Sequence, residues 1–170
     1  MRKTPYFVPY SLVVIFQLLI CTHLHVSQYL MLSVLPVIVL LIPLRYNTVV
    51  AMLVAFATGL LVDLLADGVI GLNALALVPV ALIRKPLIAR IFGTETFARQ
   101  VDISLSHYGY LKFTIALAIV QLLFLLIYVI VDSAGARSVL FCSIRIAVSL
   151  VVGVLVALAI ASVLAHEDRG

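Results

Sequence analysis

The sequence predicts an all-α membrane protein, a single domain built from about six transmembrane helices. Hydrophobic residues make up 65% of the 170 residues and charged residues only 11%, whereas soluble domains are about half apolar and a quarter charged. The apolar residues form long unbroken runs, unlike the alternating pattern of an outer-membrane barrel. Six spans of about 20 residues leave no room for a soluble catalytic or nucleic-acid-binding domain. The apolar content also excludes a disordered chain.

Each apolar run ends where charges, glycine or proline cluster. The six runs cover residues 7–22, 29–44, 48–65, 69–83, 111–131 and 138–165. The first follows Met1-Arg2-Lys3 but lacks a small-x-small cleavage site, so we expect it to remain as a helix. The runs at 29–44 and 69–83 are short for a membrane crossing, so a broken or re-entrant segment is an alternative at both.

Lys and Arg lie almost entirely on one side of the predicted bilayer, in the termini, the connections and the first residues of the fifth run. Nine of the eleven fall there: Arg2, Lys3, Arg45, Arg84, Lys85, Arg90, Arg99, Lys112 and Arg169. Arg137 lies on the other side, and Arg145 lies within the last run. Because short loops rich in Lys and Arg stay in the cytoplasm, both termini are predicted to be cytoplasmic. This sorting explains the net charge of +4 without nucleic acid.

The longest connection, residues 84–110, begins with the basic sequence Arg84-Lys85-Pro86 and also contains Arg90. Its apolar residues Leu87, Ile88, Ile91 and Phe92 share one arc of a helix. One interpretation is a short helix in the cytoplasmic interface, with its cations facing the anionic headgroups of membrane lipids. The alternative is an extension of the fourth helix that packs on the rest of the protein.

Two ionisable side chains lie within apolar runs, where a charge costs roughly 2.5–3.5 kcal/mol at the helix centre. Asp63 lies one turn after Gly59 and one turn before Asp67, on a shared helix face. Arg145 lies about two turns into the last run. The predicted topology puts Asp63 and Arg145 at similar depth, so we expect them to pair directly or through a water. Solvated helix ends, a partner-protein contact and a proton or substrate site are the alternatives.

Small residues favour a tight hairpin between the third and fourth runs. Ala55 and Gly59 form a small-xxx-small pair, which permits close helix approach. Gly71 and Asn73 follow the turn at Asp67-Gly68 and are expected to let the hairpin close.

Known catalytic patterns are missing from the sequence. It contains no GxSG serine motif, no HExxH zinc motif and no phosphate-binding glycine loop. The two glutamates, Glu95 and Glu167, lie outside the predicted spans, and Cys21 and Cys142 do not form a CxxC pair. We therefore predict no catalytic, metal or cofactor site and expect that the chain is not an enzyme.

The segment from Gly59 to Leu77 resembles the MreD family of rod-shape-determining membrane proteins. That family typically carries a glycine, an aspartate one turn later, and then a turn with a glycine-led helix, as Gly59, Asp63 and Gly71 do here. The stretch Leu82–Ile91 is similar to the continuation in MreD proteins of the Bacteroidetes type. Those proteins often carry paired histidines followed by a glutamate in the fifth helix, and residues 120–128 of this sequence carry neither.

The resemblance implies a multi-pass subunit of the bacterial cell-elongation (rod) complex in the inner membrane. Such a subunit would bind MreC and, through the complex, the SEDS glycosyltransferase and its transpeptidase, with MreB filaments on the cytoplasmic face. Its role would be to scaffold or regulate peptidoglycan synthesis and so cell shape. The MreD fold is similar to the S-components of energy-coupling-factor transporters, which gives an alternative function as a vitamin-binding subunit.

The two functions require different features. A vitamin-binding subunit needs an enclosed pocket with convergent polar groups. Polar residues within the predicted spans are limited mainly to Gln17, Asp63, Asn73, Gln121 and Arg145. A scaffold needs an apolar helix face for its partner. The fifth run could supply that face with Phe113, Val120, Phe124 and Tyr128, although the same stripe would suit a core or a lipid-facing surface.

Overall fold

The computed structural model describes residues 13–15, 17, 33–67, 69–93, 110–133 and 138–167. They form the helices α2 (Leu35–Leu41), α3 (Thr48–Val62), α4 (Leu72–Phe92), α7 (Tyr110–Ser133) and α8 (Val139–Glu167), with a π-helical turn η1 (Asp63–Asp67). These described residues contain helices, turns and loops and no strand, which confirms the all-α prediction for this part of the chain.

Three helices are long and apolar enough to cross a membrane. The candidate spans are Thr48–Leu65, Leu111–Ser133 and Val139–Ile160, and they correspond to the third, fifth and sixth predicted runs. Helix α4 has 21 residues, but it is interrupted by polar and charged side chains. The first run lies largely outside the described residues. A bundle of six spans therefore stays a prediction.

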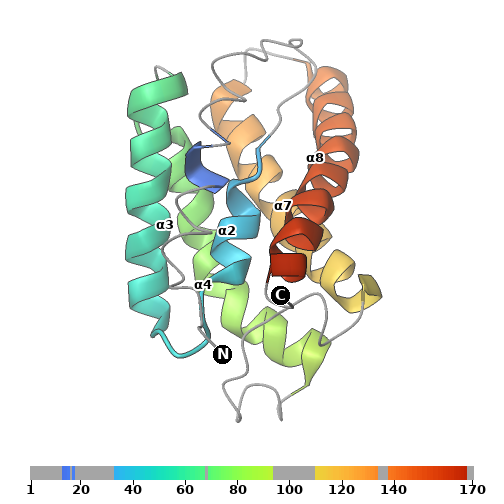
Figure 1. Ribbon diagram of the computed structural model, residues 1–170. Helices are drawn as coiled ribbons and strands as arrows, with labels where there is room; N and C mark the ends of the chain where they lie inside the picture. The colour runs from blue at the N-terminus through green and yellow to red at the C-terminus, as the bar shows by residue number, and fades with distance from the viewer. Residues whose placement is uncertain are drawn as a thin grey trace.

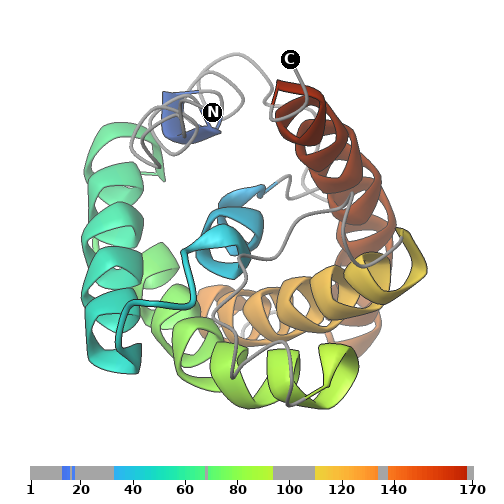
Figure 2. The same ribbon diagram turned by 60° about the horizontal axis from the view of Figure 1, so that its bottom comes forward.

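Helix α2 is short and lies at the centre of the bundle. It has 7 residues and is therefore only about 10 Å long at 1.5 Å per residue. Pro36 stands in its first turn, where a missing N–H costs no helical hydrogen bond. Helices α3, α4, α7 and α8 are arranged around α2 (Figure 2). The described part of the second predicted run therefore forms a short, broken helical segment, which is one of the alternatives that the shortness of the run suggested.

The longer helices pack in chain order, α3 on α4, α4 on α7 and α7 on α8. Neighbours in this series run in opposite directions (Figure 1). Helix α8 makes its main contacts with α7 and lies at the edge of the bundle. The core is formed by α2 and by the inward faces of α3, α4 and α7.

The stripe on α7 that sequence offered as a partner-binding face belongs to this core. Phe113, Val120 and Phe124 are fully buried, and Tyr128 is almost so. The rings of Phe124 and Tyr128 lie 5.9 Å apart between centroids. Of the three alternatives for this stripe, a partner-binding face, a lipid-facing surface and a core, the structure supports the core.

Helix α4 continues well past the predicted end of the fourth run at residue 83 and ends at Phe92. Gly93 follows with φ of 91°, a backbone conformation that favours glycine at a helix end. Ile88 and Phe92 are buried against the bundle. The arc of apolar residues after residue 83 is thus the packed extension of the fourth helix, whereas residues 94–109 lie outside the described part.

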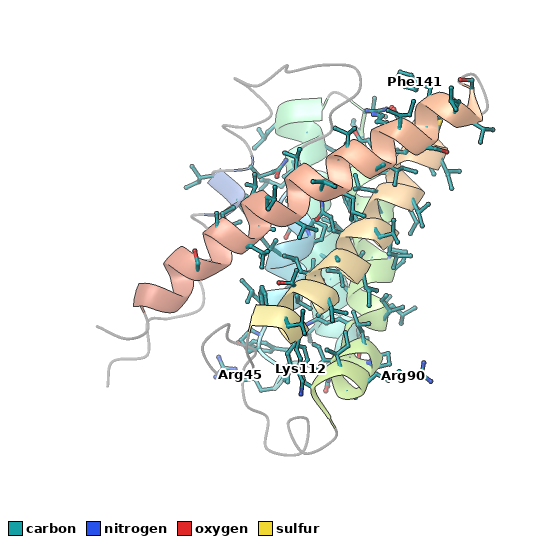
Figure 3. All side chains as sticks on the ribbon, turned by 90° about the vertical axis from the view of Figure 1, so that its right-hand side faces the viewer. Arg45, Arg90, Lys112 and Phe141 are labelled. Carbon is teal, nitrogen blue, oxygen red and sulfur yellow. The ribbon has the colours of Figure 1, made fainter. Side chains whose placement is uncertain are left out.

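Cations gather at one end of the bundle. Arg45, Arg90 and Lys112 lie at the same end, and Phe141 lies at the other (Figure 3). Arg45 is in the turn before α3, Arg90 in the last turn of α4 and Lys112 in the first turn of α7. We call this the basic end. Its three cations are among the nine that the sequence assigned to a single side of the membrane.

Candidate functional site

Asp63 is the centre of the most elaborate polar arrangement in the described structure. Its side chain is fully buried, at the junction between α3 and η1. Oδ2 accepts hydrogen bonds from the backbone N–H groups of Gly71 (2.9 Å) and Ala74 (3.3 Å). Oδ1 accepts from the backbone N–H of Asn73 (3.0 Å) and from its side-chain Nδ2 (2.9 Å). Both carboxylate oxygens are therefore engaged as acceptors.

The three backbone donors are N–H groups at the start of α4, where the helix itself provides no acceptor. The first N–H groups of any helix lack a partner within the helix, and a membrane interior offers no water to replace it. Gly71 is the N-cap residue of α4, and glycine has no side chain to act as a cap. Asp63, one helix earlier in the chain, supplies the missing acceptor. Its negative charge also matches the positive end of the α4 dipole.

Gly71 makes this geometry possible through its backbone. Its φ is 95°, in the left-handed region that glycine adopts without strain. The carbonyl of Gly71 then accepts the first helical hydrogen bond of α4, from Leu75 N at 2.8 Å. The turn thus reverses the chain and presents the first amides of α4 to Asp63.

Gly59 lets the two helices of the hairpin approach closely. A Cβ atom at this position would lie 2.5 Å from both Cα and N of Ala74 and 2.8 Å from the carbonyl carbon of Asn73. These are backbone atoms, so a side chain could be accommodated only by moving α3 away from α4. The predicted close approach at Gly59 is confirmed, and it occurs one turn before Asp63. Of Asp67, the structure describes only its backbone, at the end of η1.

The expected pair between Asp63 and Arg145 is wrong. Arg145 Nη1 donates instead to Oδ2 of Asp132, at 2.5 Å, across the α7–α8 contact. Helices α3 and α8 lie on opposite sides of the bundle, with α4 and α7 between them in the packing order (Figure 1). Similar depth in the membrane was therefore not enough to make Asp63 and Arg145 a pair. Each side chain instead binds a group on the segment next to its own helix.

Arg84 is not part of a surface loop. It lies within α4 and is the largest fully buried side chain in the described structure. Its Nε donates to the carbonyl oxygen of Leu40 at 3.2 Å. Leu40 is in the last turn of α2, where carbonyl groups lack helical partners and a cation is favourable. Arg84 thus holds the end of the central helix and is excluded from the lipid interface that one interpretation proposed for it.

The other three residues singled out after the fourth run differ from Arg84 in exposure. Lys85 is partly buried, and Pro86 and Arg90 are exposed. Pro86 lies inside α4 without ending it. Pro86 and Arg90 therefore lie on the surface of α4.

Two glutamines hold the opposite end of α2. Gln17 Oε1 accepts from Val34 N at 2.8 Å, and Gln121 Nε2 donates to the carbonyl of Ser33 at 2.9 Å. Both glutamines are buried. On α8, a Cβ at Gly153 would lie 2.7 Å from Gln121 Nε2, so this glycine leaves room for the glutamine. Both ends of the short buried helix are therefore held by side chains from other segments.

Sequence reasoning noted the polarity of Gln17 and Gln121 but gave neither a partner, and it missed Asp132 and Gly153. A signal for burial of Arg84 was present: it falls at helical spacing with Leu77, Ala81 and Ile88, all of which are buried. No comparable signal identifies Leu40, because any residue offers a backbone carbonyl.

The chemistry of the arrangement is structural. Asp63, Arg84, Gln17 and Gln121 all bond to backbone groups of helix ends. Among the described residues, no three His, Cys, Asp or Glu side chains come together as a metal ion would require. Comparison of the chain with models of protein families, with curated proteins and with solved structures gave no match.

Proposed function

We propose that the chain is a non-enzymatic, multi-pass subunit of the bacterial cell-elongation complex, of the MreD type, in the inner membrane. The observation that carries the proposal is the hairpin of α3 and α4. Gly59, Asp63 and Gly71, the residues on which the resemblance rests, act together in it: one allows close approach, one caps α4 and one turns the chain. The resemblance thus coincides with a single structural unit.

The interior of the bundle supports a scaffold over a vitamin-binding subunit. A ligand pocket needs space and polar groups that converge on it. Here the centre is occupied by α2, whose residues Leu35 to Leu40 are all buried. The polar side chains around it, Arg84, Gln17 and Gln121, bond to the ends of that helix.

Helix α8 is the surface that we assign to a partner helix. In its span, 11% of the residues are buried, compared with 44% in the span of α7. Its exposed side chains include Val148, Val151 and Leu155. Between helices in lipid, association depends on packing of such faces. We propose that the transmembrane segment of MreC packs here, with the basic end on the cytoplasmic side.

In-cell photocrosslinking tests this assignment. A photoreactive amino acid replaces Val151 on α8 in one variant and Phe56, an exposed residue of α3, in the matched control. We expect a crosslink to MreC from position 151 and little from position 56. The complex is also purified in mild detergent and its contents are identified. A tightly held vitamin without any partner protein would contradict the proposal and favour the transporter alternative.

A further inference from the structure

The outer surface of α4 carries a hollow close to the basic end. It is lined by Ile83, Pro86, Leu87 and Arg90. These residues follow the i, i+3, i+4, i+7 spacing of one helix face. Three of them are apolar and the fourth, at the end nearest the helix terminus, is a cation. The hollow is therefore an apolar strip that ends in a positive charge.

Pro86 shapes this strip. A proline inside a helix has no N–H, so the carbonyl of Leu82 loses the amide that would normally bond to it from four residues later. On the helix face, Pro86 is three residues after Ile83 and four before Arg90, and its side chain is the most compact of the residues that line the hollow. Because Pro86 and Arg90 are both exposed, the hollow is open to the surroundings of the bundle.

Arg90 gives the hollow its chemical preference. Its guanidinium projects away from the bundle, at the same end as Arg45 and Lys112 (Figure 3). At the opposite end, Arg145 is neutralised by its pairing with Asp132. An apolar strip in the membrane leading to an exposed guanidinium is complementary to an acyl chain leading to a phosphate group. A guanidinium forms bidentate hydrogen bonds with phosphate oxygens.

We propose that this hollow binds an anionic membrane phospholipid. One acyl chain lies along Ile83, Pro86 and Leu87, and the headgroup phosphate contacts Arg90. The inference does not depend on the proposed function, because it requires only that α4 lies in a bilayer. It concerns a specific lipid position on the protein surface, beyond the general attraction of the basic end for anionic lipid.

The chain contains no tryptophan, which allows a direct test. In the variant Leu87→Trp, the single indole would report on lipid in the hollow. The purified protein is placed in vesicles of phosphatidylcholine, to which dibrominated phosphatidylglycerol or dibrominated phosphatidylcholine is added as a quencher. We expect phosphatidylglycerol to bind about fivefold more strongly at this position, which corresponds to the ~1 kcal/mol typical of one cation near a membrane surface.

A second single-tryptophan variant, Leu53→Trp, is the matched control. Leu53 is exposed on α3, five residues from the start of that helix at the basic end, as Leu87 is five residues from the end of α4. We expect a preference of less than twofold there. Equal preference at the two positions would overturn the proposal, because it would indicate a diffuse surface potential.

Two charge variants in the Leu87→Trp background identify the headgroup contact. Arg90→Gln should abolish the preference for phosphatidylglycerol, whereas Lys112→Gln, which removes a cation of the same end outside the hollow, should leave it within twofold. Undiminished preference after Arg90→Gln would overturn the assignment. If Leu87→Trp does not fold, native mass spectrometry of the unmodified chain and of Arg90→Gln gives the same comparison. Retention of phosphatidylglycerol should then fall about fivefold in the variant, and equal retention would overturn the proposal.

Discussion

The hairpin of α3 and α4 and the pair of α7 and α8 are both antiparallel helix pairs, but they are held together differently. In the hairpin, Gly59 brings the backbones into close contact and Asp63 binds the amides of α4 directly. In the other pair, the polar links are the ion pair of Arg145 with Asp132, whose side chains are 13% and 27% exposed, and a hydrogen bond between Ser133 Oγ and Cys142 Sγ. A buried side chain that caps a helix end fixes the geometry of a hairpin, whereas a peripheral ion pair adds little rigidity.

The two helix pairs therefore have different roles: the α3–α4 hairpin stabilises the fold, and α8 is the helix that we assign to association with a partner. In the hairpin, the first amides of α4 are satisfied by a side chain of the same hairpin, so this link does not depend on the surroundings. In the described part of the chain, helix α8 contacts mainly α7, and few residues of its span are buried. Substitutions in the two regions should therefore have effects of different size on thermal unfolding in detergent.

The largest effect is expected for Asp63→Ala. It leaves the first amides of α4 without an acceptor, and hydrogen bonds to a charged group contribute about 1.5–3 kcal/mol each. We expect a loss of about 3 kcal/mol or more in the free energy of unfolding. Thermal unfolding in detergent, followed by size-exclusion chromatography of the heated samples, measures it. Asp63→Asn retains one acceptor oxygen and should be intermediate; wild-type stability of the alanine variant would refute the capping role.

A smaller loss is expected for Gly59→Ala. The added methyl group would meet the backbone at Ala74, and overpacking of this kind costs about 1–3 kcal/mol. The matched control is Ala57→Val on the exposed face of the same helix, which should be close to neutral in the same unfolding assay. Equal effects of the two variants would show that the close approach of α3 to α4 does not limit stability.

In the other helix pair, Gly153→Ala should cost about 1 kcal/mol, through loss of the hydrogen bond from Gln121 to Ser33. A glutamine side chain can move more easily than a backbone, so the effect is smaller than at Gly59. A double-mutant cycle with Gln121→Ala tests the cause: the alanine at position 153 should cost almost nothing once the glutamine is removed. Strictly additive losses would exclude this coupling.

The smallest effect is expected for Asp132→Asn. The ion pair with Arg145 lies near the surface, and such pairs contribute at most about 1 kcal/mol. The difference from wild type should shrink further when salt is added, since exposed charges are screened. A loss as large as that of Asp63→Ala would contradict the contrast between the two helix pairs.

Much of the hairpin could be predicted from residues close together in the sequence. Gly59, Asp63 and Gly71 lie within one turn-connected segment, so their spacing on the helix and around the turn limits where they can meet. The partner of Arg145 could not be predicted in this way. Position within a run predicts the depth of a residue in the membrane, but it does not predict which helices are neighbours. Asp132 also lies just beyond the predicted run 111–131.

Arg84 illustrates a similar limit. The sequence placed it among other cations at the end of an apolar run, where a surface position is the usual outcome. Its burial depends on the short helix α2, whose terminal carbonyl groups need a hydrogen-bond donor. The carbonyl that Arg84 binds belongs to Leu40, 44 residues earlier in the sequence. Only the folded arrangement brings that carbonyl to the guanidinium.

The sequence by itself determined the helical class, the three long apolar spans and the close approach of α3 and α4 at Gly59. These follow from local properties, namely apolar content, run length and short-range spacing. The tertiary structure alone decided that Asp63 caps α4, that α2 is short and central, that Arg84 caps α2 and that Arg145 pairs with Asp132. The reason is physical: backbone groups at helix ends take the nearest suitable side chain in space, and distance in space is set by how the helices pack.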